Sequence, residues 1–145
     1  MPTGGIKDIA MARFPKSEHL YLRSEIDALF TSGSTSASVF PIRGVFRSVP
    51  YVEGPRVKVL VSVSKRHFRL ATDRNRIKRL MREHYRLKKT DFISQLPEGV
   101  GIHIGFLWLS DKMSDQVRIE NSISTLLNII SDKIILASRK SSVGQ

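Results

Sequence analysis

Positions 74–88 constrain the fold more than any other part of the chain, because their apolar residues recur with the period of an α-helix. One arc of the helical wheel holds Ile77, Leu80, Met81, His84 and Tyr85. The opposite arc is polar and basic, with Asn75, Lys78, Arg79, Arg82, Arg86 and Lys89, flanked in the first turn by Arg74 and Arg76. Such a helix packs one face on a core and turns its cations outward, and Thr72 or Asp73 is placed to cap its start.

Positive charge is concentrated around this helix. The chain carries 24 Lys and Arg against 13 Asp and Glu, a net charge of +11, and residues 65–89 hold 11 of those cations beside only two acids, Asp73 and Glu83. A solvated helix face normally mixes the signs of charge, whereas one sign in one place favours a polyanionic partner. We expect nucleic acid to be that partner, with an anionic membrane or plain solubility as the alternatives.

Periodicity and turn residues predict the remaining elements: a helix over 25–31, a loop over 34–38, strands over 39–47 and 56–64 with a turn over 50–55 between them, a strand over 101–109 and a long helix over 115–138. Ser24 and Ser114 are placed to cap the two helices, and Gly33 is placed to end the first. Pro41 cannot donate a ladder hydrogen bond, so it implies an edge position or a bulge in its strand.

Two stripes of apolar residues define the expected core. In the strand over 56–64 alternate residues are valine, at Val57, Val59, Val61 and Val63. In the last helix the apolar stripe contains Ile119, Ile123, Leu126, Leu127, Ile130 and Ile134. We expect both stripes to be buried, together with Trp108 and His84.

These elements predict one α/β domain over residues 1–145, α+β-like, with helices packed on a mixed sheet in the order α-β-β-(β)-α-β-α. Residues 1–12 and 139–145 are expected to be flexible. Disulfides and thiolate chemistry are excluded, because the chain has no cysteine. No apolar run reaches the roughly 20 residues that span a bilayer, and the first 13 residues do not resemble a secretory signal. A cytoplasmic protein without a membrane partner is therefore expected.

The run from Arg74 to Glu83, RNRIKRLMRE, resembles the "RNR" signature of the bacterial ribonuclease P protein family. It follows a strand that ends in the sequence VSVSK, as in that family, and the N-terminal segments FPK and 20–33 are also similar. The resemblance covers residues 13–88, and the C-terminal strand and helix agree in their order. It implies the fold shared with a ribosomal small-subunit protein domain, in which a left-handed β-α-β crossover surrounds the basic helix.

The resemblance also implies a function. In this family a large RNA removes the 5′ leader from precursor tRNA, using magnesium that is bound mainly by the RNA and not by a protein-only site. The protein is a non-catalytic subunit that binds the ribonuclease P RNA and the leader of the precursor tRNA. No activity of the protein alone and no obligate protein partner are expected.

By similarity, the residues that meet the catalytic RNA are Lys65, Arg66, Arg69, Arg74, Asn75, Arg76, Lys78, Arg79, Arg82 and Arg86. Those expected to line a leader-binding cleft beside the first helix are Ile26, Phe30, Arg43 and Lys58. Two departures from the family pattern stand out. The linker 66–73 is one residue longer and lacks the usual glycine, and Ile26 occupies a position that is usually aromatic. Ile26 and Phe30 either line the cleft or simply pack the helix on the sheet.

Other functions have weaker support in the sequence. Nothing places two of the histidines at 19, 67, 84 and 103 around a scissile phosphate, and no motif for a metal site or a nucleotide-binding loop is present. A structural RNA-binding protein, such as a ribosomal component, is the main rival, because it would share the charge and the α/β fold. A DNA-binding regulator comes third, because no helix-turn-helix spacing is visible.

Overall fold

The computed structural model describes residues 14–31 and 34–143. Its elements are a 3-10 turn η1 (Lys16–Glu18), α2 (Arg23–Leu29), β1 (Thr35–Val39), β2 (Ile42–Pro50), β3 (Val57–Ser62), α3 (Ala71–Ser94), β4 (Val100–Trp108) and α4 (Gln116–Val143). The segment 1–12 that we expect to be flexible lies outside the described residues, as do Gly33 and the last two residues of 139–145.

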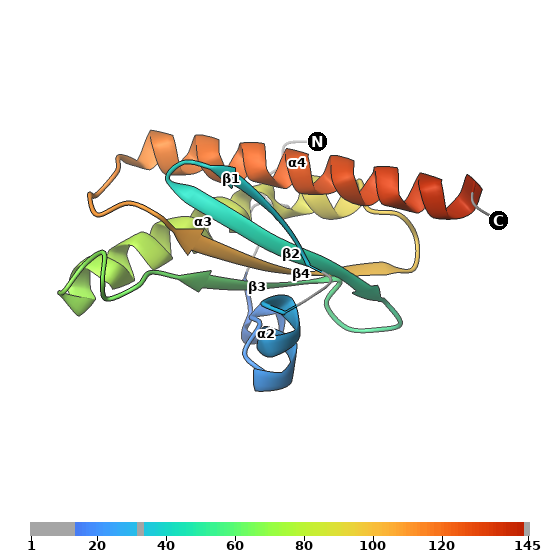
Figure 1. Cartoon of the computed structure of the whole chain (residues 1–145), viewed down its shortest axis with the longest axis horizontal. Helices are drawn as coiled ribbons and strands as arrows, with labels where there is room; N and C mark the ends of the chain where they lie inside the picture. The colour runs from blue at the N-terminus through green and yellow to red at the C-terminus, as the bar shows by residue number, and fades with distance from the viewer. Residues whose placement is uncertain (1–13, 32–33, 144–145) are drawn as a thin grey trace, which may run out of the picture.

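One four-stranded mixed sheet forms the centre of the molecule, in the order β1-β2-β4-β3. β2 pairs antiparallel with β1 and β4, whereas β3 pairs parallel with β4 and is joined to it by α3. In Figure 1, β3 and β4 both run to the left with β4 above, and α3 passes behind the sheet. The crossover is therefore left-handed, as the family resemblance implies and against the usual preference.

The two faces of the sheet are covered differently. α3 and α4 pack against one face and against each other, whereas α2 crosses the other face, where it contacts β2 and β4 (Figure 1). The helix-covered face carries the main core, which contains the alternating valines of β3, Ile102, Ile104 and Phe106 of β4, and the predicted stripe of α4. Every residue of both predicted stripes is buried, as are Trp108 and His84.

β1 is the clearest difference from the sequence prediction. Residues 34–38 are expected to be a loop because they are mostly Ser and Thr, but β1 forms an antiparallel edge strand there, in register with β2 from Thr35↔Phe46 to Val39↔Ile42. Strand propensity is overridden by pairing with a central strand. The predicted strand over 39–47 therefore contains a hairpin turn at Phe40 and Pro41, whose peptide bond is cis, and Pro41 lies in the turn and not in a bulged strand.

The predicted helix caps are wrong at all three positions. α2 starts at Arg23 and α3 at Ala71, with Leu22 and Leu70 as cap residues and no side-chain cap hydrogen bond. At α4 the side chain of Asp115 caps the helix in place of Ser114, because its Oδ1 accepts a hydrogen bond from the backbone N–H of Arg118 at 2.8 Å. Because no side chain caps α2 or α3, we attribute the positions of these two helix starts to apolar packing.

α3 is also longer than predicted, and this changes the environment of Lys89. The apolar stripe continues past 88 through Lys89 to Phe92, so Lys89 is buried instead of lying on the basic arc. Its Nζ donates hydrogen bonds to the carboxylate of Glu18 at 2.8 and 3.1 Å. Lys89 thus ties the N-terminal segment to α3.

The α4 stripe should dominate the stability of the fold. We expect Ile123→Ala to lower the free energy of unfolding by about 2–5 kcal/mol, because the side chain is fully buried and a cavity would remain. Leu136→Ala is the matched control, since Leu136 lies on the same helix but is 54 % exposed. It should change the stability by less than about 0.5 kcal/mol. Urea unfolding measures both, and equal losses would contradict this account of the core.

Candidate RNA-binding surfaces

The first surface, here called the basic surface, consists of the linker after β3 and the outer side of the first half of α3. Of the predicted residues, Lys65, Arg66, Arg69, Asn75, Arg76, Arg79 and Arg82 are exposed, and Arg74, Lys78 and Arg86 are partly buried. Packing forces this arrangement, because Ile77, Met81 and Tyr85 of the same helix are completely buried on the opposite side. Guanidinium groups bind phosphate oxygens in a bidentate manner, so the basic surface is suited to a nucleic-acid backbone.

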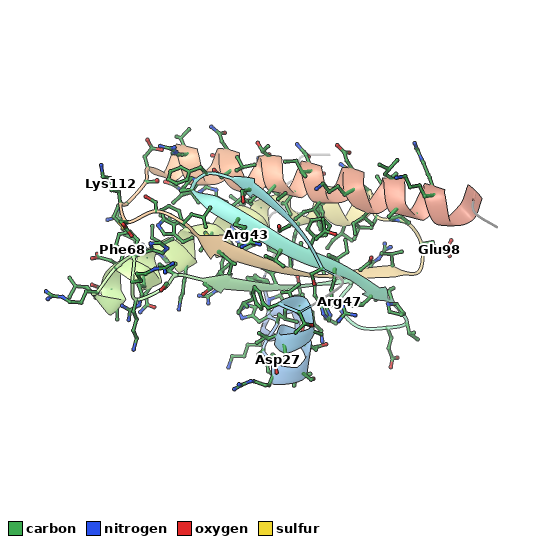
Figure 2. The ribbon with its side chains drawn as sticks, viewed as in Figure 1. Asp27, Arg43, Arg47, Phe68, Glu98 and Lys112 are labelled. Carbon is green, nitrogen blue, oxygen red and sulfur yellow. The ribbon has the colours of Figure 1, made fainter. Side chains whose placement is uncertain are left out.

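Arg74 differs in role from its neighbours. Its Nη1 donates hydrogen bonds to the backbone carbonyl oxygens of Phe68 at 2.7 Å and Arg69 at 2.8 Å. Phe68 is itself buried and joins the main core, at the end of the molecule opposite Glu98 (Figure 2). The linker is thus held by a buried aromatic anchor and a guanidinium bridge.

A second contact holds the same linker. His67 Nδ1 lies 2.7 Å from Oδ1 of Asp111, in the loop between β4 and α4. The linker therefore has a defined path that carries Lys65, Arg66 and Arg69 on its exposed side.

Arg86 is engaged within the helix. Its Nε donates a hydrogen bond to Oε2 of Glu83 at 3.1 Å, one turn earlier. This hydrogen bond, followed by the positive charge of Arg86, holds the pKa of the Glu83 carboxyl below its usual range. Glu83 therefore stays ionised and balances the charge of Arg86, so the strongest positive potential lies nearer the start of α3.

The second surface is the face of the sheet that α2 crosses, here called the α2 face. Strand alternation and register place three rows of side chains on it: Arg43, Leu107 and Ser62; Val45, Gly105 and Leu60; and Arg47, His103 and Lys58. The first row lies where β3 ends, which is the end from which the linker leaves. The two surfaces therefore adjoin at this row, in which Arg43 is the cation.

Phe30 and Ile26 differ in their burial. Ile26 is partly buried and packs on the small cluster of Leu20, Leu29 and Val45 beneath α2. Phe30 is 45 % exposed, and its ring edge lies over Gly105. A Cβ at Gly105 would come within 3.3 Å of the Phe30 ring and 3.2 Å of Leu29, so glycine is what allows this close approach.

The cations of the α2 face are not equivalent. Arg43 is exposed and donates a hydrogen bond to Oγ of Ser36 at 3.4 Å, whereas Lys58 lies 3.3 Å from the carboxylate of Glu25 and is partly neutralised. Arg47, which is not among the residues predicted for the cleft, lies on the same side of β2 as Arg43. The period of two along a strand would have found it, because Arg43 and Arg47 are four residues apart in β2.

The chain matches known proteins along most of its length. The sequence profile of the Ribonuclease P family matches residues 14–130. The chain belongs to the ribonuclease P protein family. Membership makes it a protein subunit of an endoribonuclease ribonucleoprotein, a class of RNA-binding proteins in tRNA processing.

Individual relatives agree with this ribonuclease P assignment. The chain is 40 % identical over 113 residues to the ribonuclease P protein component of Porphyromonas gingivalis, covering 77 % of this chain and 82 % of that one. It is 42 % identical over 77 residues to the corresponding protein of Chlorobaculum tepidum, covering 52 % and 50 % of the two chains.

Solved structures show the same fold. The RNase P protein of Staphylococcus aureus superimposes with a TM-score of 0.59 at 21 % identity, covering 79 % of this chain and 96 % of that one. The RNase P protein of Thermotoga maritima gives a TM-score of 0.58 at 22 % identity, with coverages of 76 % and 94 %. The predicted mixed α/β fold is thereby confirmed.

Metal centres and membrane spans were also considered for the described residues of this ribonuclease P protein, 14–31 and 34–143, and neither is found there. Among those residues no group of three or more His, Cys, Asp or Glu side chains is placed to hold a metal ion. No helix there is long and apolar enough to cross a membrane.

We expect His103 to make the stability of this ribonuclease P protein depend on pH. Burial, as the largest effect, lowers the pKa of His103 below its ordinary value of 6.5, and the cations Lys58 and Arg47 also lower it, against an opposing effect of Glu25. The unfolded chain therefore takes up a proton on acidification before the folded chain does. The free energy of unfolding should fall as the pH drops below about 6.5.

We expect His103→Gln to reduce this loss. Urea unfolding at pH 7.5 and 5.0 measures the loss for both proteins, and the difference between the two pH values should be smaller for the variant. Equal differences would show that His103 titrates alike in the folded and unfolded chain.

Proposed function

We propose that this chain is the subunit of ribonuclease P that binds the catalytic RNA through the basic surface and the 5′ leader of precursor tRNA across the α2 face. The ribonucleoprotein then removes the leader by endonucleolytic cleavage. The main support for this proposal is that exposed cations of the linker and α3 adjoin an open face of the sheet, on which Phe30 is 45 % exposed. Precursor tRNA and the ribonuclease P RNA are the partners, and no obligate protein partner is needed.

Each surface suits its proposed RNA for a physical reason. Ordered cations on a rigid helix bind the phosphates of a folded RNA, whose shape positions those phosphates. A single-stranded leader gains affinity when its bases stack on exposed aromatic rings beside a cation. Phe30 with Arg43 and Arg47 provides this combination on the α2 face.

The chemistry belongs to the RNA in this proposal. Magnesium ions bound mainly by the RNA supply the activation of water and the stabilisation of the leaving oxygen. The chain's own residues hold the RNA and the leader, and the protein alone does not cleave. Phosphate neutralisation by the basic surface lowers the magnesium concentration that the RNA needs.

Reconstitution tests this function directly. The chain combined with a bacterial ribonuclease P RNA should cleave the leader from precursor tRNA at a magnesium concentration where the RNA alone is inactive. The protein alone should leave the precursor intact. Cleavage by an RNA-free preparation, persisting after nuclease treatment, would contradict the assignment of chemistry to the RNA.

Affinity for the catalytic RNA should depend steeply on salt. If about 6–8 phosphates are neutralised, log K against log[salt] should have a slope of roughly −4 to −7. Arg79→Ala with Arg82→Ala should make the slope shallower by about one per lost contact. Lys133→Ala with Lys140→Ala on α4 removes the same charge away from the basic surface and is the matched control. Filter binding measures the slopes. If the two double variants change the slope equally, the affinity depends on the net charge of the protein and not on the basic surface.

Phe30 should matter for the precursor and not for mature tRNA. Phe30→Ala should weaken binding of precursor tRNA by the holoenzyme by about 1–3 kcal/mol, the usual size of one base–aromatic stacking contact. Affinity for mature tRNA should stay nearly unchanged, and Ile26→Phe should be tolerated. Phe40→Ala is the control, because Phe40 is 55 % exposed but lies against Arg118 of α4. A large drop in melting temperature without selective loss of precursor affinity would instead make Phe30 a packing residue.

A further inference from the structure

The loop between β4 and α4, residues 109–115, lies beside the linker although the two segments are far apart in the sequence. Figure 2 places Phe68 and Lys112, which are the sequence neighbours of His67 and Asp111, at the same end of the molecule. The hydrogen bond between His67 Nδ1 and Oδ1 of Asp111, at 2.7 Å, joins the two segments. Because an ionised carboxylate only accepts hydrogen bonds, Nδ1 is the donor. This hydrogen bond is here called the clasp.

The loop gives the clasp a fixed point of attachment. The backbone N–H of Leu109 donates a hydrogen bond to the carbonyl oxygen of Pro41 at 2.8 Å, which ties the loop to the turn between β1 and β2. The hydroxyl of the buried Ser110 accepts a hydrogen bond from the backbone N–H of Lys112 at 3.0 Å. The backbone around Asp111 is therefore held by contacts that do not involve the linker.

The linker itself has fewer contacts of this kind. The backbone N–H groups of His67 and Phe68 donate hydrogen bonds to the carbonyl oxygen of Ser64, and Arg74 bonds to the linker from the start of α3. These partners are all near neighbours in the sequence. The clasp instead reaches the linker from a segment 44 residues away, and it holds a His67 side chain that is only 13 % exposed.

The acid of the clasp is unexpected at this place. The side chain of Asp111 is 79 % exposed and lies next to the basic surface, where its negative charge lowers the potential that attracts phosphate. A pair with one largely exposed partner also contributes little to the stability of a fold. Charge and stability therefore give no reason for a carboxylate here, whereas the hydrogen bond to the linker does.

We propose that His67 and Asp111 are positioning residues for the catalytic RNA, because the clasp holds the linker in the arrangement that presents Lys65 and Arg66 to phosphates. The proposal rests on the proposed function, since it takes the basic surface to bind that RNA. The phosphates of a folded RNA have fixed positions, so a linker that is ordered beforehand loses less binding free energy on contact. An acid thus raises the affinity of this protein for a polyanion, and it does so without touching the RNA.

Three variants separate the hydrogen bond from the charge. Asp111→Ala removes both and should weaken binding of the catalytic RNA by about three- to tenfold, because the linker must then be ordered on binding. Asp111→Asn removes only the charge, since the amide oxygen still accepts from His67, and should bind at least as tightly as the unmodified chain. Asp73→Asn is the matched control, because it removes one negative charge from the first turn of α3 without touching the clasp. It should also bind at least as tightly as the unmodified chain.

Filter binding at one pH and one salt concentration measures the affinity of the full chain and its variants for a bacterial ribonuclease P RNA. His67→Ala should weaken binding about as much as Asp111→Ala, and the double variant should lose no more than either alone, because both remove the same interaction. In the free proteins, hydrogen exchange at residues 65–70 should be faster in Asp111→Ala and unchanged in Asp111→Asn. Melting temperatures show that each variant is folded.

The possible results distinguish this proposal from the proposed function. The clasp has no positioning role if Asp111→Ala binds as tightly as Asp111→Asn, because the hydrogen bond then makes no difference. It also has none if the losses of the two alanine variants add in the double variant. If the unmodified chain binds the ribonuclease P RNA no more tightly than an unrelated folded RNA of equal length, the proposed function itself is wrong.

Discussion

Burial of one side of α3 is the constraint on which the rest of the structure depends. Ile77, Met81 and Tyr85 are completely removed from water between the sheet and α4, so the rotation of the helix about its axis is fixed. Once the rotation is fixed, Arg76, Arg79 and Arg82 have nowhere to lie except outside. Hydrophobic burial thus provides the free energy that holds like charges close together, which electrostatics alone would oppose.

The unequal cover of the sheet follows from the chain order. The two long helices occupy one face completely, whereas the seven-residue α2 is too short to cover the other. The face that α2 leaves open carries Arg43 and Arg47 beside a small apolar cluster. A sheet with one closed and one open face can therefore keep a continuous core and still present a strip of side chains to a partner.

The periodicity of the sequence predicted those elements whose formation depends mainly on their own residues. The alternating valines of β3 and the stripe of α4 were predictable, because burial of a strand or helix face leaves a period in the sequence. β1 was not, because its Ser-rich sequence forms a strand only through its pairing with β2. Lys89 was misplaced because its burial depends on Glu18, 71 residues away.

The candidate sites also differ in how much of them the sequence could predict. The basic surface is continuous in sequence, so its residues could be named in advance. The cluster of Glu25, Lys58 and His103 joins α2, β3 and β4, and no spacing in the sequence connects those three residues. Contacts between distant elements of this kind become visible only when the fold is known.

The bridge from Arg74 to the carbonyl oxygens of Phe68 and Arg69 has a consequence for the cost of assembly. A loop of about eight residues that was mobile before binding would lose roughly 1–2 kcal/mol of backbone entropy per residue on meeting RNA. Here the guanidinium and the buried Phe68 ring order the loop while the protein folds. The first arginine of the signature thus orders the linker while the chain folds, so that under the proposed function less of the binding free energy is lost in ordering this loop.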